Sequence, residues 1–183
     1  ADYIYLDTDE RRRFAQVSHE YLIEQLQFQT ESGNPKSIDL NFNHPVKELI
    51  WIGLPGAAAA GSGPSTPTDI SGTAATYQLK LNGHDRFAAR NYTYFTRTQI
   101  WEHHTGFGGI AASASGGGAD SIGVYSFALK PEEHQPSGTC NFSRIDNAQM
   151  IIGGTGVAAY HIYAVNYNVL RIMSGMGGLA YSN

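Results

Sequence analysis

The segment YSFALKPEEHQPSGTCNFSRIDNA, residues 125–148, decides the fold of this chain. Large apolar residues alternate with small ones from 125 to 129, as in a half-buried strand. Pro131 ends that strand, because proline has no N–H to donate to a neighbouring strand. A polar loop and a turn signal at 136–138 lead to a second expected strand at 140–145. The segment predicts two strands joined by a polar loop, without a poised nucleophile.

Composition extends this interpretation to the whole chain. The 183 residues suit one domain of ordinary size. They include 21 glycines, 11 tyrosines and 8 phenylalanines, and only 15% of the chain is charged. Aromatic residues favour strands and glycines favour turns, so a β-rich fold is expected.

Charge and cysteine content limit the classes of function. The net charge is −4, and the one tight basic cluster is Arg11-Arg12-Arg13, whereas a nucleic-acid surface normally needs extensive positive charge. The single cysteine, Cys140, excludes an intrachain disulfide and a multi-cysteine zinc site, and its apolar surroundings predict a buried, inert thiol. The sequence has no signal peptide and no apolar run of ~18–20 residues, so intracellular assembly is expected.

Towards the N-terminus, the pattern predicts a short strand at 2–6, a helix at about 9–16 and a long strand at 20–30. Acidic and hydroxyl residues at 7–10 are typical of a helix start. For the three arginines on this helix, a solvated face is favoured over an anionic partner. Neither face of the long strand is uniformly apolar, so a subunit contact is expected near it.

Further strands are expected at 38–42, 46–53 and 77–81, and two closing strands at about 157–165 and 167–173. Short strands separated by turn signals indicate a sandwich of two sheets.

Two segments rich in glycine, alanine and serine, 53–75 and 102–121, are expected to be exposed loops with little role in the core. Residues 84–101 lie between them. Their aromatic spacing fits neither a helix nor a strand, so one or two short helices or an irregular segment are predicted.

Four segments, in this order, resemble segments of the major capsid proteins of large icosahedral double-stranded DNA viruses, the iridovirus and phycodnavirus group. They are DYIYLDTDERRRFAQVSHEYLIEQLQFQ at 2–29, LNFNHPVKELIW at 40–51, FALKPEEHQPSGTCNFSRIDNA at 127–148 and YAVNYNVLRIMSGMGGLAYSN at 163–183. Such shared, unusual segments identify the family.

The resemblance implies a fold and a domain plan. Family members resemble two jelly rolls in tandem, and this chain resembles the second one, from the connector onward. It implies an all-β, antiparallel, eight-stranded jelly-roll sandwich with a short connector helix and long Gly/Ala/Ser-rich loops. Residues 1–18 would form the connector strand and helix, and residues 19–183 the jelly-roll domain. A chain that starts at Ala1 is expected to be a fragment, a processed piece or a separately numbered part.

The resemblance also implies a structural role. Such proteins form trimers of pseudo-hexagonal outline that tile an icosahedral shell. The implied partners are other copies in a homotrimer, neighbouring capsomers and minor capsid proteins, with an indirect relation to an internal membrane and no direct contact with nucleic acid. The implied location is the virion capsid, assembled in the host cytoplasm. Neither enzymatic activity nor a cofactor is expected.

Loop position and polarity predict which residues contact other subunits. The expected contact segments are the helix from Asp9 to Gln16, the loop from Lys130 to Ser137 and, third, the run from Ser174 to Asn183. The individual candidates are Arg11, Arg12, Arg13, Lys130, Glu132, Glu133, His134 and Tyr181.

Side chains that could carry chemistry form no convincing site. His103 and His104 are adjacent, so in a strand they would point to opposite faces, and no H-x-H spacing occurs. Solvated loop histidines are therefore favoured over a metal site that would add His84, Glu102 and His134. Neither Glu132-Glu133 nor Asp146 suggests acid–base catalysis. The sequon at Asn91 is a weak glycosylation candidate, and Asn141 is expected to be structural.

Two other functions stay open at this point. A lectin-like carbohydrate-binding sandwich would use an aromatic platform of Tyr94, Phe95, Trp101 and Phe107. Glycan binding lost on Trp101→Ala would favour it. A cupin-type metalloenzyme would be distinguished by metal analysis.

Overall fold

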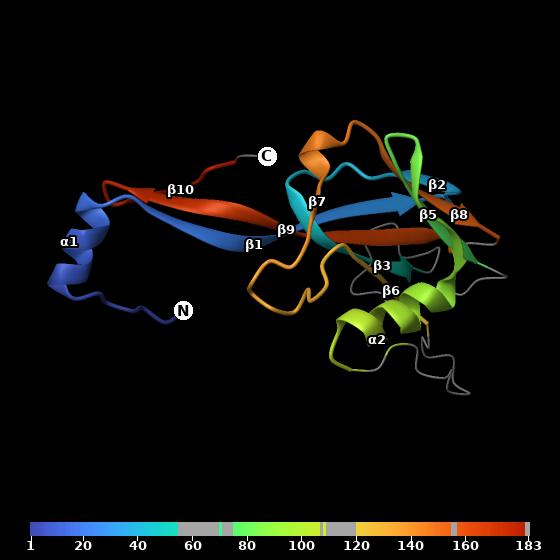
Figure 1. Ribbon diagram of the computed structural model, residues 1–183, viewed down its shortest axis with the longest axis horizontal. Coiled ribbons are helices and arrows are strands. Elements are labelled where there is room, and N and C mark those ends of the chain that lie inside the picture. Colours follow the sequence, from blue (N-terminus) through green and yellow to red (C-terminus); the bar gives the residue numbers. More distant parts are fainter. Residues whose placement is uncertain (55–69, 71–74, 107, 109–119, 155–156, 182–183) are drawn as a thin grey trace. The chain divides into compact units, whose positions relative to one another are not determined.

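The computed structural model describes residues 1–54, 70, 75–106, 108, 120–154 and 157–181 (Figure 1). The chain divides into two compact units. One combines Ala1–Gln25 with Tyr167–Asn183, and the other is Leu26–Asn166. The expected domain boundary after residue 18 stays a prediction. No helix among the described residues is long and apolar enough to cross a membrane.

Among the described residues, eight strands make up the two main paths of a two-sheet sandwich (Figure 1). The first sheet has the order β1-β9-β3-β6, with β1 (His19–Ser32), β9 (Ala159–Met173), β3 (Pro45–Leu54) and β6 (Ile122–Ser126). The second has the order β2-β8-β4-β5, with β2 (Ser37–Asp39), β8 (Ala148–Gly153), β4 (Thr76–Leu81) and β5 (His84–Asn91).

The chain passes repeatedly between the two sheets, which is the jelly-roll connectivity. Strand pairs within the sandwich, such as β3–β6, β3–β9 and β4–β8, are antiparallel. The predicted eight-stranded jelly roll is therefore confirmed. The described residues add two short strands, β7 (Cys140–Asn141) beside β3 and β10 (Met176–Leu179) beside β9.

Aromatic side chains from both sheets meet in the core. The Trp51 ring centroid lies 5.4 Å from that of Tyr77 and 5.2 Å from that of Phe95, and all three side chains are buried. The Tyr77 hydroxyl donates to the Ile70 carbonyl at 3.1 Å. Ile70 is fully buried, so the expectation that segment 53–75 has little role in the core is wrong at this residue. Its neighbours 55–69 and 71–74 lie outside the described residues.

Gly123 makes room for the core tryptophan. It pairs with Trp51 across β6 and β3, and a Cβ added there would lie 2.4 Å from the indole Cε2. No side chain fits at that separation, so the large ring requires a glycine opposite it.

The side-chain amides of two glutamines on β1 bond to backbone groups at the edge of the sandwich, in the place of a neighbouring strand. The Gln27 side-chain amide donates to the Asn43 carbonyl at 2.6 Å and accepts from the Asn43 amide at 2.9 Å. Gln29 likewise donates to the Asp39 carbonyl and accepts from the Asn41 amide. These bonds satisfy the backbone of the segment after β2, whose alternate side chains enter the core.

Gln27→Leu is expected to lower the free energy of unfolding by about 1–2 kcal/mol, because both backbone groups of Asn43 lose their partner while the volume changes little. Urea unfolding measures the loss. Gln135→Leu, at an exposed loop position, is the matched control and is expected to be near neutral. Equal stability of the two variants would show that Gln27 does not support the segment.

Three sequence-based expectations about strands are wrong. Residues 2–6 form no strand, because no described strand pairs with them, and Tyr3 and Tyr5 stay more than 80% exposed. The strand at 125–129 ends at Ser126, whose hydroxyl accepts from the Ala128 amide and donates to the Ala128 carbonyl in a tight turn. The strand at 140–145 shrinks to two residues.

A 3₁₀ helix (Phe142–Arg144) replaces the rest of that second strand. The Asn141 side chain accepts from the Ser143 amide at 3.1 Å and so caps the helix. Asn141 is therefore structural, as expected. Cys140 is only half-buried, and partial burial raises the pKa of its thiol, which keeps it protonated and unreactive at neutral pH.

Two further differences concern strand boundaries. Residues 84–91 form β5, and a π-helical turn (Tyr94–Thr98) and α2 (Gln99–His103) follow it. The two expected closing strands are one strand, β9, because residues 159–173 contain no glycine or proline to interrupt it.

The unit made of Ala1–Gln25 and Tyr167–Asn183 contains α1 (Thr8–Gln16) and the β9–β10 hairpin. Asp7 caps the helix, since its carboxylate accepts from the Thr8 amide at 2.7 Å. The Gly175 amide in the hairpin turn donates to the Phe14 carbonyl at 3.2 Å. The expected helix at 9–16 is confirmed to within one residue.

Candidate subunit-contact surfaces

The predicted contact loop, Lys130 to Ser137, is held in place by its own residues. The Ser137 hydroxyl accepts from the Lys130 amide at 2.9 Å and donates to the Lys130 carbonyl at 3.3 Å, which closes the loop at its base. The Lys130 ammonium lies 3.0 Å from the Glu133 carboxylate, and both side chains are exposed. Such an exposed pair contributes little to stability. Both charges therefore stay accessible to another molecule.

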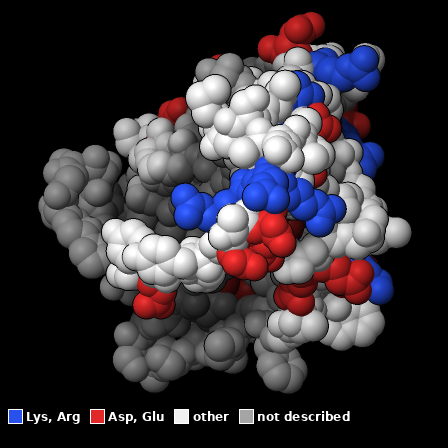
Figure 2. Space-filling model, turned by 90° about the vertical axis from the view of Figure 1, so that its left-hand side faces the viewer, with Lys and Arg blue, Asp and Glu red and all other residues white. Residues whose placement is uncertain are grey.

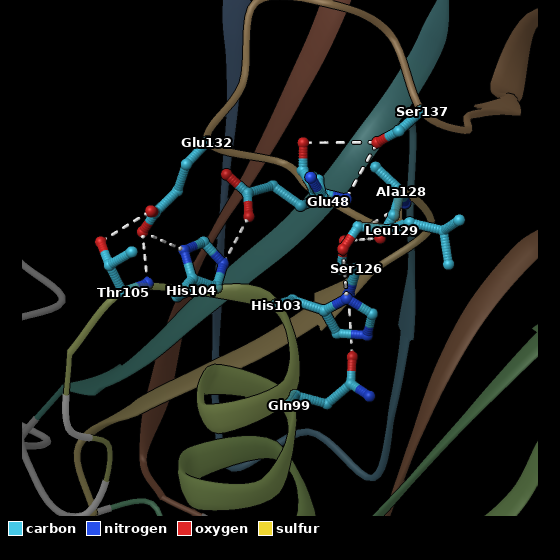
Figure 3. A network of polar contacts seen from close by, with 11 residues as sticks. Glu48, Gln99, His103, His104, Thr105, Ser126, Ala128, Leu129, Glu132 and Ser137 are labelled. Carbon is cyan, nitrogen blue, oxygen red and sulfur yellow. Dashed lines mark hydrogen bonds and ion pairs between the residues drawn. The ribbon is translucent and has the colours of Figure 1, made fainter.

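Glu132 anchors this loop to the end of α2 (Figure 3). Its carboxylate accepts from the Thr105 amide at 2.9 Å and from the Thr105 hydroxyl at 2.7 Å. These two hydrogen bonds, with a smaller contribution from His104, lower the pKa of Glu132 below its ordinary value. The carboxylate is thus already engaged within the chain, whereas His134 is exposed.

His104 is structural and not solvated, which corrects the favoured expectation for it, whereas His103 is partly exposed. His103 Nδ1 lies 3.0 Å from the Leu129 carbonyl oxygen. His104 Nδ1 lies 3.2 Å from Glu132, and its Nε2 lies 3.0 Å from the Glu48 carboxylate on β3 (Figure 3). Only 18% of the His104 side chain and 9% of the Glu48 side chain are exposed. One imidazole therefore bridges the loop and the sheet.

Glu132→Ala is expected to release the loop from α2, because the Thr105 amide then has no carboxylate to bond. The Thr105 amide hydrogen should exchange with solvent roughly tenfold faster, while amides in β3 and β9 are unchanged. Hydrogen-exchange mass spectrometry measures this difference. Glu133→Ala, one residue away, is the control and should leave Thr105 protected. Protection retained in Glu132→Ala would contradict the anchoring role.

The three arginines of α1 are exposed, and the described helix has no buried residue. Arg12 lies 3.7 Å from Asp9 in an exposed pair, as the favoured interpretation of a solvated face expects. On the face drawn in Figure 2, basic and acidic side chains lie next to one another. Such a surface does not resemble the continuous positive field of a nucleic-acid-binding face.

The C-terminal candidate, Tyr181, has an anchored backbone and a free ring. Asn168 Nδ2 donates to the Tyr181 carbonyl at 2.8 Å and to the Gln25 side chain at 2.8 Å. The Tyr181 side chain is 62% exposed. Residues 182–183 of the same segment lie outside the described part.

The remaining candidate residues do not form a site. Asn91 is exposed, but its side chain accepts from the Thr93 amide and hydroxyl in a local turn. Of the proposed sugar platform, Phe95 is buried in the core and Trp101 is 80% exposed, so they cannot share one stacking surface. Phe107 lies outside the described residues. Within the described part of the chain, no group of histidine, cysteine and carboxylate side chains is arranged to hold a metal.

Sequence reasoning expected a subunit contact near β1 but did not identify the exposed apolar residues on it. Gln25, Gln27 and Gln29 are half-buried, while Leu26 and Phe28 point outward and are 61% and 54% exposed. The alternation of glutamine with large apolar residues is visible in the sequence. It could have been recognised only with the knowledge that the glutamines face inward.

Comparison with known proteins identifies relatives along almost the whole chain. The family model described as "Large eukaryotic DNA virus major capsid protein" matches residues 10–178. The major capsid protein of Pyramimonas orientalis virus is 52% identical over 200 residues, which cover 100% of this chain and 48% of the relative. That of Paramecium bursaria Chlorella virus 1 is 42% identical over 241 residues, covering 100% and 53%.

Solved structures agree with this similarity. The chain in the quasi-atomic model of the PBCV-1 virus capsid matches with a TM-score of 0.70 and 39% identity, covering 99% of this chain and 56% of that one. The Faustovirus major capsid protein matches with a TM-score of 0.58 and 14% identity, which concerns the fold alone. The chain spans about half the length of the curated relatives it matches.

Proposed function

Since this chain belongs to the family of large eukaryotic DNA virus major capsid proteins, we propose that it is part of a trimeric capsomer of pseudo-hexagonal outline that tiles an icosahedral shell. The observation that carries the proposal is the match to a chain of the PBCV-1 capsid over 99% of the present one, at 39% identity. Similarity at this level extends beyond the fold to the sequence of the elements themselves.

A shell of this kind depends on many weak contacts repeated by symmetry. Each contact contributes little alone, but closed symmetry makes the contacts simultaneous, which raises the overall affinity. The surfaces proposed for these contacts are the exposed arginines of α1, the Lys130 to Ser137 loop and the C-terminal segment with Tyr181. The proposed partners are copies of the same protein, neighbouring capsomers and minor capsid proteins, with assembly in the host cytoplasm. No enzymatic step is required.

Charge reversal on α1 tests this assignment. Arg11→Glu is expected to weaken association between copies about tenfold, corresponding to ~1.4 kcal/mol, and to reduce its salt dependence, because a contact charge is replaced by one of opposite sign. Analytical ultracentrifugation at two salt concentrations measures both changes. Arg144→Glu is the matched control, since it makes the same charge change at another exposed position. Equal association of the two variants would remove α1 from the list of contacts.

A further inference from the structure

The segment at residues 39–43, where β2 ends, is extended, and its backbone groups face two different edges in turn. The odd-numbered residues bond to glutamine side chains of β1. The even-numbered residues face the opposite edge, since the Leu40 amide donates to the Ala148 carbonyl at 2.8 Å. Alternate residues of an extended chain direct their backbone groups to the same side. The amide and the carbonyl of Phe42 therefore face the same edge as those of Leu40.

At this edge the chain separates from its neighbour and meets it again at His44. The His44 amide donates to the Ser143 hydroxyl at 2.8 Å, and the His44 carbonyl accepts from the Phe142 amide at 3.0 Å. Between the bonds of Leu40 and those of His44, no described residue bonds to the amide or the carbonyl of Phe42. Backbone groups need a hydrogen-bond partner, so these two groups are available to water or to a ligand.

A polar groove lies at this separation and has a volume of about 520 Å³. It is lined by residues 39–43 on one side and by residues 142, 143 and 145–149 on the other. Sites for small ligands have volumes of roughly 300–1,000 Å³. The lining combines buried side chains, such as those of Leu40 and Phe142, with exposed polar ones. The backbone groups of Phe42 thus face a space that holds a short stretch of another chain.

The exposed lining of the polar groove is acidic. It includes Asp39 and Asp146, and none of the lining residues is a lysine or an arginine. The Asp39 carboxylate accepts from the Gln149 side chain at 2.7 Å. The Asp146 carboxylate has no partner in the described part of the chain, whereas its backbone amide donates to the Asn82 side chain at 2.9 Å. Asp146 is therefore held in place with its charge available to a cation.

We propose that the polar groove binds an extended peptide segment of a separate polypeptide, through backbone pairing with Phe42. The Phe42 amide donates to the carbonyl of one peptide residue, and the Phe42 carbonyl accepts from the amide of the same residue. This is the arrangement of a hydrogen-bonded pair in antiparallel strands. Amide groups already occupy the other edge of the segment, where glutamines of β1 take the place of a strand. The site is separate from the surfaces proposed for capsomer contacts and goes beyond that function.

The same pairing defines the sequence of the peptide. Directly opposed residues direct their side chains to one face, and the Phe42 side chain is buried in the core. The peptide residue opposite Phe42 must therefore be small, and glycine fits best. Its two neighbours direct their side chains outward, towards the acidic lining. Lysine or arginine at these positions is attracted to Asp146. The recognised segment is a glycine with basic residues beside it.

Hydrogen exchange in the free 183-residue chain, followed residue by residue by NMR, tests the open edge. The Asn41 and Asn43 amides donate to the side chains of Gln29 and Gln27, which protects them. The Phe42 amide between them is expected to exchange at least about tenfold faster, because it has no partner within the chain. Equal protection of the three amides would overturn the proposal, since the edge would then be closed without a ligand.

Titration of the same chain with the peptide acetyl-Thr-Lys-Gly-Lys-Thr-amide tests binding. The peptide is expected to shift the Phe42 amide resonance and to slow the exchange of this amide about tenfold at saturation, because the amide gains a carbonyl partner. The control peptide has N-methylglycine at its centre and lacks the amide that the Phe42 carbonyl accepts. It is expected to bind about fivefold more weakly, the effect of one lost hydrogen bond.

Charge reversal tests the recognition of the basic residues. Asp146→Lys is expected to weaken binding of the lysine peptide about tenfold, because attraction becomes repulsion. Glu102→Lys makes the same charge change at an exposed position on α2, outside the groove, and should leave binding nearly unchanged. Circular dichroism confirms that both variants are folded. Three results would each overturn the proposal: no shift at Phe42 up to about 10 mM peptide, equal binding of the N-methylated peptide, or equal binding by the two variants.

Discussion

Trp51→Ala is expected to lower the free energy of unfolding by about 3–5 kcal/mol, the range for removing a large buried aromatic side chain. The indole is 2% exposed and contacts the rings of Tyr77 and Phe95, which come from outside β3. Gly123 lies directly against the ring and has no side chain that could fill the resulting cavity. Since neighbouring residues cannot collapse into the space, the loss should lie in the upper half of the range.

Urea unfolding followed by circular dichroism measures this loss. The other tryptophan provides a matched control, because Trp101 is 80% exposed on α2. Trp101→Ala deletes the same atoms and is expected to change stability by less than ~0.5 kcal/mol. Similar losses in the two variants would contradict the placement of Trp51 at the centre of the sandwich.

Asp120→Asn is expected to lower the free energy of unfolding by about 2–3 kcal/mol at neutral pH, because it weakens several charge-assisted hydrogen bonds. The Asp120 carboxylate is 6% exposed and accepts from the Thr96 hydroxyl at 2.6 Å and from Arg97 Nη2 at 2.8 Å. The Arg97 side chain is half exposed, so solvent retains part of its stabilisation, which limits the loss.

The same contact predicts a pH dependence with a definite sign. The hydrogen bond from Arg97, and after it that from Thr96, hold the pKa of Asp120 below its ordinary value of 3.8, although burial opposes the shift. A lowered pKa in the folded state stabilises the protein above the unfolded-state pKa. That stabilisation is lost as the pH falls through the folded-state value.

Wild-type protein should therefore lose stability below about pH 4 more steeply than Asp120→Asn. Thermal unfolding between pH 7 and pH 2.5 compares the two. Curves that stay parallel over this range would mean that Asp120 is not held as an ion pair in the folded protein.

The sequence allowed most of the sandwich to be predicted, because several strands bury one face completely. In β4 the apolar alternation sets the register, and the predicted segment 77–81 differs from Thr76–Leu81 by one residue. The predicted segment 46–53 differs from Pro45–Leu54 by one residue at each end, whereas the strand at Ala148–Gly153 was not predicted. The helix at Thr8–Gln16 carries its own start signal in Asp7. In these elements local preference and tertiary packing agree.

In other elements, side-chain hydrogen bonds take the place of backbone pairing or of apolar packing. There the hydrophobic pattern of the sequence does not predict the structure. β5 is an edge strand with only Phe87 partly buried, so it has no alternation to detect. Inward-facing glutamines on β1 invert the usual polarity, because their partners at residues 39–43 are distant in sequence. The roles of Glu132 and His104 were likewise not predictable, because they depend on the contact between the end of α2 and the loop after β6. Sequence periodicity contains no information on such pairings.

The measurement that tests the central claim most directly is the mass of the native assembly by light scattering, with the mass of its intact polypeptide determined on the same sample. Membership of a capsomer predicts an assembly of three polypeptides that persists on dilution. A species with the mass of a single polypeptide at every concentration tested would contradict the capsomer proposal.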